Sequence, residues 1–91
     1  MSVSKKQDNL ERLRQGISTL ESIANSPNVP RNIRNMIKEM IASLNDESLP
    51  IAVRAANIIS ALDDLTQDPN LASHIRVVLW QAVSYLEGIR E

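Results

Sequence analysis

The side chains that could carry out chemistry are few, and they gather in the stretch DPNLASHIR at residues 68–76. This stretch holds the only histidine, His74, with Ser73 and Arg76 as its nearest polar neighbours. A metal site or a catalytic dyad would need further ligands, or a nucleophile with an oriented base. On a helical wheel His74 falls beside an apolar stripe, so we expect a histidine at the surface or at the edge of the core.

The carboxylates and glycines point to no enzyme either. Asp63 and Asp64 are adjacent, so they face different directions on a helix and cannot act as a pair. The two glycines are isolated, which excludes a glycine-rich phosphate loop. The absence of cysteine excludes a thiol nucleophile, a disulfide and a cysteine-ligated metal. We therefore expect a non-enzymatic protein with no catalytic, cofactor-binding or metal-binding residues.

Four segments, at about residues 6–24, 30–44, 50–66 and 72–89, carry apolar residues at three- and four-residue spacing. This period is typical of amphipathic helices with one buried face. The core should be aliphatic, because the 91 residues include no phenylalanine, one tryptophan and one tyrosine. Short connections favour antiparallel neighbours. The sequence thus predicts one all-α domain over residues 1–91, a compact four-helix array and most simply an up-and-down bundle.

The three breaks between these segments share one pattern: SPNVPRNIR at 26–34, DESLPIAVR at 46–54 and DPNLASHIR at 68–76. Serine or aspartate followed by proline suits a type I turn. We place Pro30 and Pro50 as the first helical residues, where a missing N–H does no harm. The apolar fourth and eighth residues of each break should pack together as a hydrophobic staple does.

An arginine ends each of the three breaks. Helical side chains lean toward the N-terminus, so Arg54 could reach back to Asp46 and Arg76 to Asp68. Arg34 has only a serine at the matching position and would have to bind loop carbonyls or a neighbour. We favour this structural role over ligand binding, which stays open as the alternative.

Two resemblances follow from these stretches. DESLPIAVRAANIISAL at 46–62 resembles the helix starts of HEAT and armadillo repeats. VPRNIR, LPIAVRAANIISALDDLTQDPN and IRVVLW, in this order, resemble a small archaeal family, uncharacterised protein family 0147. The resemblance implies an all-helical cytoplasmic archaeal protein without assigned activity, and it carries over no site residues.

Charge is unevenly distributed along the chain. Residues 1–45 hold seven Lys/Arg and four Asp/Glu, while residues 46–91 hold three and seven. A basic patch at Arg12, Arg31, Arg34 and Lys38 could bind RNA, free or on a ribosome, or an acidic partner. The net charge of −1 and the lack of interleaved aromatic residues favour a solvated surface instead. No stretch is apolar enough to span a membrane or to serve as an export signal, so we expect a cytoplasmic protein.

A second candidate surface lies on the last segment, where Val77, Trp80 and Ser84 fall off the apolar stripe. Tryptophan is enriched at binding hot spots. If this face is open, the simplest occupant is a second copy of the chain or a protein partner. If it is covered, Trp80 belongs to a helix buried on two sides, or the long N-terminal arm folds over it.

Overall fold

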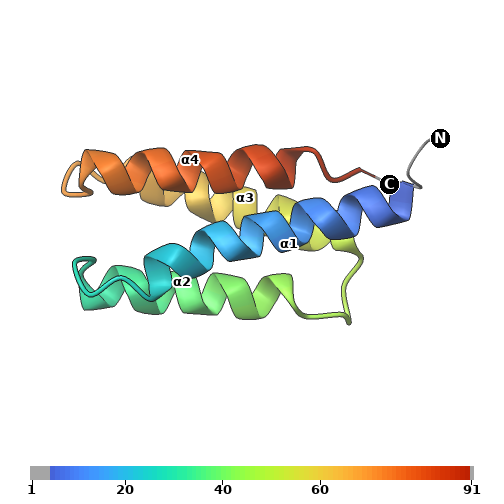
Figure 1. Ribbon diagram of the computed structural model, residues 1–91, viewed down its shortest axis with the longest axis horizontal. Coiled ribbons are helices and arrows are strands. Elements are labelled where there is room, and N and C mark those ends of the chain that lie inside the picture. The colour runs from blue at the N-terminus through green and yellow to red at the C-terminus, as the bar shows by residue number, and fades with distance from the viewer. Residues whose placement is uncertain (1–4, 91) are drawn as a thin grey trace.

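The computed structural model describes residues 5–90, which form four helices and no strand: α1 (Lys5–Ala24), α2 (Arg31–Leu44), α3 (Ile51–Thr66) and α4 (Ser73–Glu87) (Figure 1). The all-α prediction is confirmed. Within the described residues, none of these helices combines the length and the apolar character needed to cross a membrane.

The helices pack as a four-membered bundle. α1 lies against α2 and α4, and α3 lies against the same two helices. The start of α1, the end of α4 and the α2–α3 connection lie at one end of the bundle, and the other two connections lie at the opposite end (Figure 1). Consecutive helices therefore run in opposite directions, as an up-and-down bundle requires.

The core is aliphatic, as predicted. The largest side chains without solvent exposure all lie on the predicted apolar stripes: Leu20, Ile37, Leu44, Leu62, Leu79 and Leu86. Gly16 lets α1 and α4 approach closely, because an added Cβ there would lie 2.9 Å from Leu86 Cδ2. Leu10 and Met36 share the three- and four-residue spacing of the apolar stripes and were expected in the core, but they are 45% and 40% exposed.

The three connections repeat one backbone geometry, as the shared sequence pattern predicts. In each, the carbonyl of the first residue accepts a hydrogen bond from the N–H of the fourth: Ser26 from Val29, Asp46 from Leu49 and Asp68 from Leu71, at 3.1–3.3 Å. Each connection is thus a turn of four residues followed by a helix. The repeat in sequence is a repeat in structure.

Two finer predictions about these corners are wrong. Pro30 and Pro50 are N-caps with ψ of 144° and 147°, one residue before the helices that they were expected to begin. An extended ψ lets each proline carbonyl start the helical hydrogen bonds without adopting helical torsions itself. The fourth and eighth residues are buried at the first and third corners, but Leu49 and Val53 of the second corner are 39% and 42% exposed. The second corner therefore lacks a buried staple.

Candidate functional site

The arginines at the helix starts bind the ends of the preceding helices. Arg54 Nη1 donates to the carbonyl of Leu44, the last residue of α2, at 2.9 Å. Arg76 Nε donates to the carbonyl of Thr66, the last residue of α3, at 2.8 Å. In both cases the acceptor lies ten residues before the arginine. Arg76 also reaches back to Asp68 as predicted, but to its backbone carbonyl, whereas the bond of Arg54 goes to Leu44 and not to Asp46.

The physical reason lies in the helix ends. The last carbonyls of a helix have no partner within it and carry partial negative charge. Neither α2 nor α3 has a basic residue in its own last turn. The arginine at the start of the next helix supplies the positive charge that each of these helix ends lacks. Arg76 also donates from Nη2 to the carbonyls of Asp68 and Leu71, at 2.9 and 3.3 Å, so it holds the whole third turn.

The two aspartates stabilise their own turns. Asp46 Oδ1 accepts from Ser48 N at 3.0 Å and from Ser48 Oγ at 2.6 Å. Asp68 Oδ1 accepts from Asn70 N at 2.9 Å. The bonds from Ser48, first its hydroxyl and then its backbone N–H, lower the pKa of Asp46, and the charge of Arg54 adds a smaller effect in the same direction. Asp46 and Asp68 thus stabilise the second and third turns.

Arg34 is the exception among the three arginines. Its Nε, like that of Arg54, is buried without a hydrogen-bond partner in the described part of the chain, but residues 5–90 contain no bond from Arg34 to a carbonyl that matches the bond of Arg54 to Leu44. The sequence pattern predicted a loop carbonyl or a neighbour as its partner. The first corner thus carries the arginine without the contact that the other two corners make.

The side chains considered for enzymatic chemistry lie at the surface. His74, Asp63 and Asp64 are exposed. No group of three His, Asp or Glu side chains within residues 5–90 is placed to hold a metal ion.

The predicted basic patch is divided by the fold. Arg12 pairs with Asp8 at 3.1 Å and lies across Gly88, beside the end of α4. Arg31 begins α2 at the opposite end of the bundle (Figure 1). Arg31 and Lys38 are exposed on α2, whereas Arg34 is half-buried. RNA binding by these four residues stays a prediction.

The outer surface of α4 is open. Trp80 is 53% exposed and Val77 is 49% exposed, and Ser84 is also exposed. The opposite side of α4 carries Leu79, Ala82 and Leu86 into the core without exposure. We name Val77, Trp80 and Ser84, the predicted interaction residues, the α4 outer face. Of the two alternatives for Trp80, the structure favours the open one.

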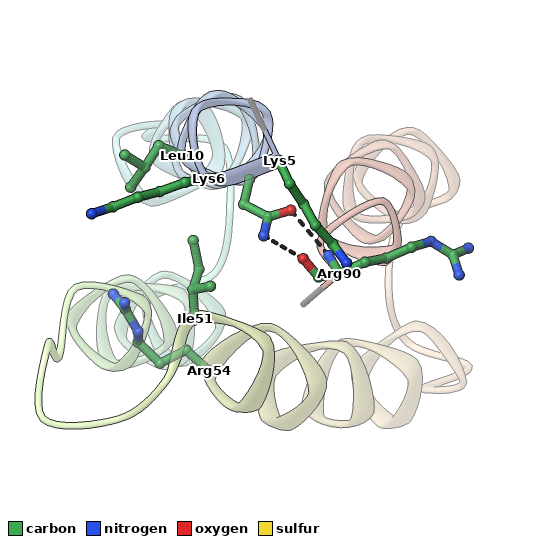
Figure 2. A pocket seen from close by; sticks show the side chains of 7 residues that line it. Lys5, Lys6, Leu10, Ile51, Arg54 and Arg90 are labelled. Atoms are coloured by element: carbon green, nitrogen blue, oxygen red, sulfur yellow. Dashed lines mark hydrogen bonds between the residues drawn. The ribbon is translucent and has the colours of Figure 1, made fainter. Parts of the chain in front are cut away.

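Sequence reasoning missed a contact that joins the two ends of the chain. The side chain of Asn9, on α1, is buried. Its Nδ2 donates to the carbonyl of Arg90, and its Oδ1 accepts from the N–H of Arg90 at 3.0 Å (Figure 2). An asparagine on the polar side of an amphipathic helix gives no sign of such a partner 81 residues away.

The protein is a small all-helical bundle. Its described residues form no metal-binding cluster, and α4 exposes Trp80. The chain belongs to the Uncharacterised protein family (UPF0147), whose model matches residues 1–89. The resemblance of the sequence to uncharacterised protein family 0147 is thereby confirmed.

Named relatives and solved structures agree. UPF0147 proteins of Sulfurisphaera tokodaii and Methanosarcina mazei are 44% and 46% identical to the chain, over 92% and 90% of its length and 94% and 88% of theirs. The crystal structure of the unknown function protein MMP1188 superimposes with a TM-score of 0.83 at 38% identity, covering 90% of this chain and 93% of that one. A UPF0147 structure from Thermoplasma acidophilum gives 0.85 at 26% identity, covering 92% and 99%.

Proposed function

We propose that this protein is a non-enzymatic interaction module that associates with a second copy of itself through the α4 outer face. The observation that carries the proposal is the exposure of Trp80 beside Val77 on one helix. Leaving a large aromatic surface in water is costly, and burying it against a partner recovers that free energy.

The charge around Trp80 supports a copy of the same chain as the occupant. The exposed residues of α4 from Ser73 to Tyr85 include no lysine, arginine, aspartate or glutamate: they are Ser73, His74, Val77, Trp80, Gln81, Ser84 and Tyr85. Exposed residues of α1, by contrast, include Lys6, Asp8, Glu11 and Arg14. A two-fold contact brings a surface against itself, so a surface without charge meets no like-charge repulsion. Depletion of charge is also typical of interface centres.

The test uses Trp80 both as the contact and as the reporter. Light scattering should give the mass of a dimer for the wild type and of a monomer for Trp80→Glu, because the substitution places two carboxylates in the contact. Trp80 is the only tryptophan, so its emission should shift to longer wavelength as the wild type is diluted and dissociates.

Met36→Glu is the matched control, because it introduces the same charge at an apolar residue on α2 with 40% exposure. It should leave the dimer mass unchanged. A monomeric wild type over the full concentration range, or a Trp80→Glu variant that remains dimeric, would contradict the proposal.

A further inference from the structure

A pocket of about 450 Å³ lies at the end of the bundle where α1 and α3 begin and the chain ends. Its lining consists of Lys5, Lys6, Asn9, Leu10, Ile51, Arg54 and Arg90 (Figure 2). The volume falls within the range of about 300–1,000 Å³ typical of small-molecule sites. The pocket is built by three separate parts of the sequence, which the contact between Asn9 and Arg90 helps to bring together.

The charge of this lining has one sign. Four of the seven residues are lysine or arginine and none is aspartate or glutamate. Figure 2 shows the charged ends of Lys6 and Arg54 on the same side of the pocket, while the guanidinium of Arg90 points to the opposite side. Two cations from different helices on one side of a partly apolar pocket attract an anion more strongly than isolated surface charges do.

Arg54 is held in place for such a role. Its Nη1 donates to the Leu44 carbonyl, which fixes the guanidinium against the end of α2. No other nitrogen of this guanidinium makes a hydrogen bond within the described part of the chain, and Nε is buried. A guanidinium that is already oriented loses less side-chain entropy when an anion binds.

The remaining wall is apolar. Leu10 is 45% exposed although it lies on the stripe that α1 otherwise buries, and Ile51 is half-buried opposite it. In Figure 2 Leu10 lies beside the α1 backbone next to Lys6, and Ile51 extends from the start of α3 toward α1, next to Arg54. An apolar surface beside two cations matches a ligand with an apolar body and a negative head.

We propose that this pocket binds a small amphipathic anion, with a carboxylate or phosphate head at Lys6 and Arg54 and an apolar body against Leu10 and Ile51. Such a site goes beyond self-association, since it lies at the starts of α1 and α3 and uses none of the residues of the α4 outer face. The two properties can be tested separately.

The test is a titration of the ¹⁵N-labelled full chain, followed by amide chemical shifts, with octanoate and octyl phosphate as probes. Saturable shifts centred on Lys6, Leu10, Ile51 and Arg54 are expected with at least one of the two probes, and the pair identifies the preferred head group. Lys6→Glu should weaken binding about tenfold, because it replaces attraction by repulsion at the head. Lys38→Glu, the same change on exposed α2, should bind as the wild type does.

Three further measurements distinguish binding in this pocket from non-specific binding. Acetate should bind more weakly because it lacks the apolar body, and Leu10→Ser should lower affinity for octanoate while leaving the fold intact at an exposed residue. Trp80→Glu should bind as the wild type does. Octylammonium binding as tightly as octanoate, shifts centred on Val77 and Trp80, or equal affinity of Lys6→Glu and wild type would each overturn the proposal.

Discussion

Arg76 Nε lies 2.8 Å from the carbonyl oxygen of Thr66 and closes the end of α3 from the start of α4. Arg54 makes the equivalent contact to Leu44 across the preceding corner. A cation near the start of a helix opposes the dipole of its own helix. Here each of these side chains reaches past that start to the carbonyl end of the helix before, where its charge is favourable. The recurring arginine therefore fastens two consecutive helices at their shared corner.

Arg76→Met should lower the free energy of unfolding by about 2 kcal/mol, because hydrogen bonds from a charged donor to three carbonyls are lost while the apolar stem is kept. Urea denaturation followed by circular dichroism measures the change. Arg14→Met is the control, since Arg14 is largely exposed and pairs with Glu11, which is exposed as well. Its effect should stay below about 0.5 kcal/mol. Equal effects of the two substitutions would show that Arg76 does not secure the corner.

The three corner arginines should rank by the carbonyls that they hold. Arg54→Met removes one hydrogen bond to a carbonyl and should cost about 1 kcal/mol. Arg34→Met should lie within about 0.5 kcal/mol of the wild type, because within residues 5–90 Arg34 lacks the bond to a helix-end carbonyl that Arg54 makes, and its buried Nε has no partner. The same denaturation experiment gives both values. A large loss at Arg34 would reveal a contact that fastens the first corner as well.

The helices and their buried faces could be predicted because both depend on local spacing. A residue such as Leu20 or Leu79 is buried by its place on the helix face, whichever helix covers it. The turns could be predicted for the same reason, since proline and aspartate act on neighbouring backbone. The partners of the arginines could not, because the sequence displays carboxylates as acceptors and gives no indication of which backbone carbonyls are left open. The constant ten-residue step from the helix end to Arg54 and Arg76 was the available signal.

The candidate site could be predicted only in part. The position of Trp80 off the apolar stripe followed from the helical wheel, whereas its exposure depends on what packs nearby. No sequence pattern indicated the pocket, because Lys6, Ile51 and Arg90 are far apart in the sequence and come together only in the folded bundle. The patch of Arg12 with the α2 residues stays a prediction: similar charge in one half of the sequence does not show that the side chains share one surface, and Arg12 lies beside the end of α4 while Arg31 begins α2 at the opposite end of the bundle.

Ser48→Ala should raise the pKa of Asp46 toward its ordinary value. The hydroxyl of Ser48 is the main cause of the lowered pKa, and the backbone N–H of residue 48 remains to hold part of the effect. The ¹³C shift of the Asp46 carboxyl carbon as a function of pH measures the change. Ser60→Ala, at an exposed residue of α3, should leave this pKa unchanged.

The sign of the effect on stability follows from the same shift. Because the pKa is lower in the folded state, the ionised carboxylate stabilises the fold at pH values above the unfolded pKa. That contribution disappears as the pH falls through the folded pKa. Ser48→Ala should therefore lose less stability on acidification than the wild type does. A steeper acid loss in the variant would contradict this account of the second corner.

Asn9→Ala should release the end of the chain from α1. The substitution removes both hydrogen bonds to the backbone of Arg90 and leaves its carbonyl and N–H in a partly buried position. The amide of Arg90 should then exchange with solvent faster, and the free energy of unfolding should fall by about 1–2 kcal/mol. Hydrogen exchange measured by NMR follows the first effect, and urea denaturation follows the second.

Asn35→Ala, at an exposed residue of α2, is the control and should change neither quantity. Asn9 also lines the proposed anion pocket. Its loss should weaken octanoate binding, because Arg90, which forms one wall of the pocket, is then held less firmly. An unchanged exchange rate at Arg90 in the Asn9→Ala variant would mean that the chain end is held by the packing of Ile89 alone, which is 8% exposed. Faster exchange together with weaker binding would tie the shape of the pocket to this one side chain.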